Sequence, residues 1–212
     1  MENILVATEI RSFFPEAGPI SLSLAPGDCC HLQGSEKSCN ALFEILTGLK
    51  KPDEGTVTVL GQDIYTLESP QRAAFRRDHL GAIPKGSGFL PELTVLEQIK
   101  YPMLLAGLSR EEITMRIQKN TLSYLPIHAL YNPAKRCSQR TLALAGVLRA
   151  RVMAPSILIL NAPFDHLNQK DGELVWQQIQ NILDAKIAFL YLSSAPTPRD
   201  ILWNKTMQLS RR

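Results

Sequence analysis

Apolar residues occur in short, separated blocks along this chain, and the spacing within each block predicts its secondary structure. Continuous apolar runs at Ile157–Leu160 and Ile187–Leu192 are typical of strands that are buried on both faces of a sheet. Strands with alternating apolar residues are expected at residues 3–10, 19–24 and 56–60. Helical spacing over residues 170–184 predicts an amphipathic helix. Strands that alternate with helices indicate an α/β fold with helices on both faces of its sheet.

The strand expected at Cys29–Leu32 is followed directly by a turn of small residues and then by a helix. The turn begins at Gly34 and Ser35. Apolar residues on one face of the helix are expected to point inward: Ala41, Leu42, Ile45, Leu46 and Leu49. A strand, a tight turn and a helix in this order are the layout of a phosphate-binding loop.

Helix-start signals predict one helix in the core and an all-helical region after it. Ser69, as an N-cap before Pro70, predicts the helix of the core, which ends near residue 78. The spacings of Thr94–Glu97 and Ser109–Glu112 each predict a capping box. We therefore expect a helical lobe from residue 94 to about 136, and a further helix from Ser138 to residue 153.

These elements predict one domain with two parts. Residues 1–88 and 154–212 are expected to form an α/β core, and residues 89–153 a helical subdomain inserted into it. A length of 212 residues with 45% hydrophobic and 20% charged residues suits a folded domain that needs no disulfide.

Charge and cysteine content exclude several classes of function. A net charge of +3 without a basic stripe gives no indication of a nucleic-acid partner. The cysteines lack the spacing of a zinc site, so we expect free thiols and no metal centre: Cys29, Cys30, Cys39 and Cys137. The apolar runs are too short to cross a bilayer, so membrane association is expected to come through a partner.

Three segments carry a resemblance to a known family: KPDEGTVTVLGQDI at 51–64, LPELTVLEQI at 90–99 and PMLLAGL at 102–108. Together they resemble the ATP-binding subunit of ABC transporters, and most closely its lipoprotein-release and macrolide-export branch. The resemblance implies a core like that of P-loop NTPases, a mixed sheet flanked by helices, with the inserted helical subdomain of ABC ATPases.

The resemblance also implies which residues would bind nucleotide, and the family's residues have changed there. The Gly, Lys and hydroxyl positions of G-x-x-x-x-G-K-[S/T] fall on Ser38, Cys39 and Asn40, and a loop glycine has become Glu36. The phosphate-binding lysine is thus a thiol, and the Mg²⁺-binding hydroxyl an amide. The implied nucleotide-binding positions are Gly34, Ser35, Lys37, Ser38, Cys39, Asn40 and Ala41, with Phe13 or Phe14 as the residue that would stack on adenine.

The positions that the resemblance implies for catalysis are altered too. The Asp-Glu pair after the buried strand falls on Asn161 and Ala162, the metal-sensing Gln on Lys85, and the switch His on Ser194. General-base assistance contributes about 10²–10⁴ in rate, so a change to alanine predicts near-complete loss of hydrolysis. We expect no intact catalytic residue.

The family signature Leu-Ser-Gly-Gly-Gln falls on residues 137–141, where only Ser138 is retained. Gln139 and Arg140 occupy the two glycine positions, and side chains there would fill the space over a γ-phosphate. We expect Ser138 to act simply as the cap of a helix.

Together these changes predict a subunit without ATP hydrolysis, which docks on or regulates a transmembrane ABC permease from the cytoplasmic face of the inner or plasma membrane. No cofactor is expected. A groove between the core and the helical lobe is expected to bind the permease through Lys85, Phe89, Leu90, Tyr101, Met103 and Leu104.

Two further points stay open at this stage. One alternative is a weakly active ATPase that binds ATP and Mg²⁺ weakly, with Lys37 and Asp165 in place of the lost groups. The chain could also form a homodimer, or a heterodimer with another ATP-binding subunit. Binding of nucleotide in the presence and absence of Mg²⁺ discriminates the weak ATPase from the docking subunit.

Overall fold

A five-stranded parallel sheet lies at the centre of the fold, in the order β6-β7-β8-β3-β9. The computed structural model describes residues 2–12, 19–86, 88–120, 124–182, 186–195 and 203–209. The strands are β3 Cys29–Gln33, β6 Leu80–Ile83, β7 Ile157–Asn161, β8 Ala188–Ser193 and β9 Lys205–Gln208. Strands β7 and β8 are buried at every position, which confirms the prediction from their continuous apolar runs.

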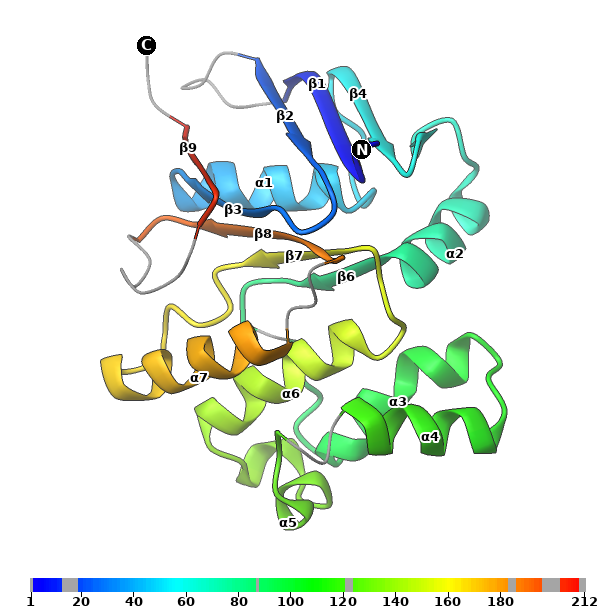
Figure 1. The fold of residues 1–212 in the computed structure, drawn as a ribbon, viewed down its shortest axis with the longest axis vertical. Helices are drawn as coiled ribbons and strands as arrows, with labels where there is room; N and C mark the ends of the chain where they lie inside the picture. The colour runs from blue at the N-terminus through cyan, green and yellow to red at the C-terminus, as the bar shows by residue number, and fades with distance from the viewer. Residues whose placement is uncertain are drawn as a thin grey trace.

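An antiparallel sheet in the order β2-β1-β4-β5 lies beside it, on the far side of helix α1 (Figure 1). Its strands are β1 Leu5–Arg11, β2 Ile20–Leu24, β4 Glu54–Val59 and β5 Gln62–Asp63. The expected α/β fold is confirmed. All described parallel pairs lie in the five-stranded sheet, and all described antiparallel strand pairs lie in the four-stranded sheet.

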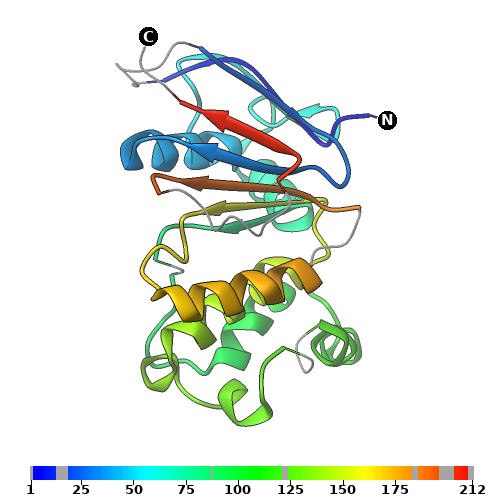
Figure 2. The ribbon, with the colours of Figure 1, turned by 60° about the vertical axis from the view of Figure 1, so that its left-hand side comes forward.

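Helices cover both faces of the parallel sheet. Helix α1 lies between the two sheets, and α6 and α7 lie on the opposite face, with α3, α4 and α5 beyond them (Figures 1 and 2). The bounds are α1 Glu36–Leu46, α2 Ser69–His79, α3 Val95–Leu105, α4 Arg110–Asn120, α5 Ile127–Leu130, the 3₁₀ turn η1 Ala134–Arg136, α6 Gln139–Arg151 and α7 Gln169–Ile182.

The predicted helix starts agree with the structure except at α2. At Thr94 and Ser109, the N-cap hydroxyl accepts a hydrogen bond from the backbone three residues later, and the Glu at that position accepts one from the cap backbone. Ser69 is not a cap: Glu68 is the N-cap, and its backbone N–H donates to Gln71 Oε1 at 3.3 Å. Helix α2 therefore starts one residue earlier than predicted.

The core forms two clusters, one on each face of the parallel sheet. The first joins the antiparallel sheet and α1 to the sheet, with Leu42, Ile45 and Leu46 buried as predicted. Leu49 lies beyond the end of α1 and is 57% exposed, so the expectation that it points inward is wrong. The second cluster holds side chains of α3, α6 and α7 against the other face.

Gly81, in β6, allows this second layer to approach closely. A Cβ at this position would lie 2.3 Å from Leu158 Cδ2 and 2.5 Å from the carbonyl oxygen of Ala150, so strand and helix α6 would have to separate. We therefore expect Gly81→Ala to lower the free energy of unfolding by about 1–3 kcal/mol, measured by urea denaturation.

Gly172 provides the matched control, because it lies inside α7 and a Cβ there meets nothing within 4 Å. Since alanine is the better helix former, Gly172→Ala should raise stability by up to about 1 kcal/mol. If Gly81→Ala were as stable as Gly172→Ala, the close contact between β6 and α6 would be refuted.

Candidate functional site

The carboxyl ends of β3, β7 and β8 meet at one edge of the parallel sheet and bring the implied nucleotide and catalytic positions together. The backbone N–H of Gly34, after β3, donates to the Ser193 carbonyl at 3.0 Å. Ala162, after β7, donates to the Leu192 carbonyl at 2.8 Å. Ligands of open parallel sheets bind at this kind of edge, so it is the candidate site.

The turn after β3 is tight, as expected, because α1 already begins at Glu36. Ser35 is the N-cap: its Oγ accepts the backbone N–H of Ser38 at 3.2 Å, and its carbonyl accepts that of Cys39 at 2.9 Å. These two N–H groups are thus bonded within the first turn of α1. Residues at this position of a phosphate loop offer their N–H groups to phosphate instead.

Cys39, which the resemblance places at the lysine position, carries no positive charge. It is 1% exposed and belongs to the core cluster around α1. Burial raises the pKa of the Cys39 thiol to about 11, so the side chain is neutral near pH 7. Ser38 is also buried, Ala41 is half-buried and Lys37 is exposed on the outer side of the first turn.

Two amides face one another where the resemblance placed magnesium ligands. Asn161 Nδ2, at the end of β7, donates to Asn40 Oδ1 in α1 at 2.6 Å. Asn161 is 3% exposed. The hydrogen bond joins α1 to the sheet through two neutral groups.

An ion pair closes the outer side of the same edge. Lys85 Nζ lies 2.6 Å from Glu36 Oε2, with the two side chains 43% and 59% exposed. Because solvent screens such a pair, its contribution to stability is about 0–1 kcal/mol. It connects the first turn of α1 to the segment that follows β6.

The remaining implied catalytic positions supply no base. Ala162 is buried in a left-handed backbone conformation with φ of 42°, and Ser194 is exposed. The carboxylate that does lie close by is Asp165, which accepts a hydrogen bond from the Tyr191 hydroxyl at 3.1 Å. Burial raises the pKa of Asp165 above its usual value.

The signature positions lie at the start of α6, as expected. Ser138 Oγ accepts the backbone N–H of Thr141 at 3.2 Å, which confirms its role as a helix cap. Gln139 is the first helical residue, and Arg140 forms an ion pair with Asp171 of α7 at 3.2 Å. Phe13 and Phe14 lie outside the described residues.

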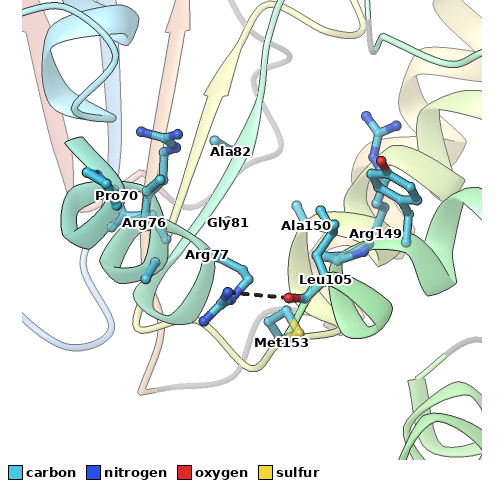
Figure 3. Close-up of a pocket in the computed structure, with 14 residues that line it drawn as sticks. Pro70, Arg76, Arg77, Gly81, Ala82, Leu105, Arg149, Ala150 and Met153 are labelled. Atoms are coloured by element: carbon cyan, nitrogen blue, oxygen red, sulfur yellow. Dashed lines mark hydrogen bonds between the residues drawn. The ribbon is translucent and has the colours of Figure 1, made fainter. Parts of the chain in front are cut away.

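A pocket of about 620 Å³ lies between α2 and β6 on one side and α3 and α6 on the other (Figure 3). Of the residues expected to dock a permease, Tyr101 lines this pocket. Met103 is fully buried in the second core cluster, so its side chain is not available for docking. Leu90 and Leu104 are exposed outside the pocket.

Other contacts at the site were not visible in the sequence. The Arg149 guanidinium carbon lies over the Phe89 ring, 4.4 Å from the ring centroid. Gly34 lies close to Leu209: a Cβ on Gly34 would lie 2.9 Å from Leu209 Cδ1. Sequence reasoning missed the arginines of the pocket as well, although α2 ends in a visibly basic turn. In the described part of the chain, no group of three or more His, Cys, Asp or Glu is placed to hold a metal ion.

Comparison with known proteins identifies the family. The profile of the family described as "ABC transporter" matches residues 18–165. The chain belongs to the ABC transporter family. The cassette is 27% identical over 180 residues to the lipoprotein-releasing system ATP-binding protein LolD 1 of Rhodopirellula baltica, covering 81% of this chain and 79% of that protein.

A second relative of the cassette is the macrolide export ATP-binding/permease protein MacB of Shigella flexneri. The two are 29% identical over 194 residues, which is 87% of this chain and 30% of MacB. These relatives confirm the lipoprotein-release and macrolide-export branch. The dimeric structure of the ABC transporter cassette MJ0796 shares the fold, with a TM-score of 0.77 and 20% identity over 90% of this chain and 88% of that one.

The described helices of the cassette include none with the length and apolar character that crossing a membrane requires.

The amide contact of this cassette can be tested by a double-mutant cycle. Asn40→Ala and Asn161→Ala should each lower the free energy of unfolding by about 1–3 kcal/mol, because each leaves the other amide without its partner. The double variant should lose less than the sum of the two losses, by about 0.5–1.5 kcal/mol. Strictly additive losses in chemical denaturation would mean that the two amides are not coupled.

Proposed function

We propose that this ABC cassette does not hydrolyse ATP and acts as a docking or regulatory subunit of a transmembrane permease. The observation that carries the proposal is the hydrogen bond from Asn161 to Asn40. Magnesium favours charged carboxylate, hydroxyl and phosphate oxygens in a regular octahedron. A neutral amide pair in direct contact suits that ion poorly.

The charges at the edge support the same conclusion. The lysine position is a buried, neutral thiol, and Glu36 adds a carboxylate to the loop. At about 4–6 Å, a carboxylate and a phosphate repel each other by roughly 1 kcal/mol in water. The nearby Lys85 is already paired with Glu36. These residues do not fit a triphosphate with magnesium, and Ala162 offers no group to polarise water.

A weakly active ATPase is the competing proposal. Two cations near the first turn of α1 support it. Lys37 lies on that turn, and Lys85 forms an ion pair with Glu36 of the same turn. Asp165, close to the same edge, has a raised pKa and is the nearest candidate for proton transfer. This proposal requires measurable binding of magnesium and nucleotide, so binding decides between the two.

Calorimetry with ATP, in the presence and absence of Mg²⁺, should detect no binding tighter than about 100 μM, which corresponds to about −5.5 kcal/mol. Phosphate release should stay at the level of the buffer. Ala162→Glu should not restore hydrolysis, because the phosphate loop would still have no cation. The LolD relative, named as an ATP-binding protein, is assayed in parallel as the positive control for binding. Binding below 100 μM or steady phosphate release would favour the weak ATPase.

The permease partner is proposed from the relatives. MacB carries an ATP-binding part and a permease part under one name, and this chain matches 30% of its length. We therefore propose that a permease binds the cassette at the pocket between α2 and α3, at the cytoplasmic membrane surface. Because the MJ0796 structure is dimeric, we also propose that the cassette pairs, with itself or with another ATP-binding subunit.

Docking can be tested with two equally exposed apolar residues. Leu105 lines the pocket and Met115 lies on α4 outside it, and each is 61% exposed. When the chain is co-expressed with a candidate permease that it binds, Leu105→Asp should reduce recovery of that permease at least tenfold. Met115→Asp should leave recovery unchanged. Equal recovery with both variants would place the docking surface elsewhere.

A further inference from the structure

A second pocket, of about 540 Å³, lies at the edge of the parallel sheet opposite the candidate site. Its walls come from the last turns of α4 and α6 and from the segments that lead into the amino ends of β7 and β8. Among its lining residues that the structure describes, none is acidic. Its four cations are Arg116, Lys119, Arg151 and Lys186. We call this site the basic pocket.

Capping of helix ends accounts for only part of this charge. The Arg116 guanidinium donates to the carbonyl of Val152, the C-cap of α6, at 3.2 Å. A cation is favourable there, because the carboxyl end of a helix carries about half a negative charge. The ends of α4 and α6 together therefore balance about one of the four positive charges. Glu112, one turn before Arg116, accepts the backbone N–H of Ser109 at the start of α4.

Two of the cations differ in how the protein holds them. Arg116 is half-buried and fixed against the end of α6 by its bond to Val152. Lys119 is exposed, and no ion pair to it is found within the described residues. The basic pocket thus combines a preoriented guanidinium with an ammonium group that can move to meet a ligand.

Apolar groups form much of the remaining wall. Met115, Val152, Pro155 and Ile187 line the basic pocket beside the cations. Pockets that hold organic ligands typically measure about 300–1,000 Å³, and this one lies within that range. The apolar wall and the volume together favour a ligand with a carbon skeleton over a single inorganic ion.

The density of positive charge favours phosphate over carboxylate. A phosphate ester carries about −1.5 to −2 charges on one group, whereas an acidic peptide carries one charge per side chain. A guanidinium can bind two phosphate oxygens at once, and a lysine adds a point charge. A nucleic acid would require a basic stripe along the surface, and the net charge of +3 gives no sign of one.

We propose that the basic pocket binds a compact organic anion that carries two or more phosphate groups. Arg116 and Arg151 contact one phosphate, the exposed Lys119 and Lys186 neutralise the other, and the apolar wall contacts the carbon skeleton. A soluble sugar phosphate and the headgroup of an anionic lipid share this chemistry.

The site is independent of the nucleotide edge and of permease docking, but it lies next to the docking pocket. Arg151 and Val152 line the basic pocket, while Ala150 and Met153, in the same turn or just beyond it, line the pocket between α2 and α3. The end of α6 thus separates the two pockets.

The test uses the full chain and two phosphate probes. Fructose 1,6-bisphosphate represents a soluble ligand, and we expect it to bind in calorimetry with a Kd below about 1 mM at low salt. Amide signals of residues 119, 156 and 187 should shift in NMR spectra, and the affinity should fall about tenfold as NaCl is raised from 50 to 300 mM. Vesicles of phosphatidylcholine with about one-third cardiolipin represent the lipid source, with pure phosphatidylcholine vesicles as their control.

A double variant and a matched single variant locate the binding. Lys119→Gln combined with Lys186→Gln should weaken binding about tenfold or more, because each removes a charge from the pocket. Lys170→Gln removes an exposed lysine of α7 outside the pocket and should leave binding unchanged.

Binding of either probe that the double variant loses supports the inference and identifies the source of the phosphate. Binding of neither probe, or binding that the double variant retains, overturns it. Tighter binding of a hexaglutamate peptide than of the bisphosphate overturns the choice of phosphate. ATP bound in this pocket would be lost in the double variant and would not require Mg²⁺, whereas ATP at the carboxyl edge would survive the two substitutions. The test of the proposed function therefore stays separate.

Discussion

The parallel pairing of β3, β8 and β7 requires cover on both faces of the sheet, and the rest of the structure follows from it. Because β7 and β8 are buried throughout, α1 must pack on one face and α6 and α7 on the other. The same pairing brings the strand ends at Gln33, Asn161 and Ser193 to one edge. The position of the candidate site is therefore a property of the backbone. The side chains at that edge can change without loss of the fold.

The side chains at the edge satisfy one another without the charged groups that the resemblance implied there. Where the edge is buried, its groups are neutral and bonded: Cys39 lies in the core, and Asn161 donates to Asn40. Where it is exposed, opposite charges pair, as Glu36 does with Lys85. The substitutions are physically consistent as a set.

Local patterns in the sequence were sufficient for the strands, for most helix starts and for the fold class. The caps at Thr94 and Ser138 were predictable because each depends on a residue three positions away. Periodicity misplaced Leu49, which lies beyond the helix end, and it could not show that Met103 faces the core while Leu104 faces solvent. Contacts between distant positions, such as Asn40 with Asn161, depend on the tertiary fold and leave no local signal.

The pocket and the edge are connected through β6. Leu80 and Ala82 line the pocket, and Lys85, just beyond the end of the same strand, pairs with Glu36. An exposed ion pair contributes about 1 kcal/mol at most, so breaking it changes an equilibrium by no more than about fivefold. A ligand at the edge could therefore shift partner affinity only slightly through this pair. As far as this ion pair carries it, binding at the pocket is nearly independent of the state of the edge, which suits the proposed docking subunit without a nucleotide cycle.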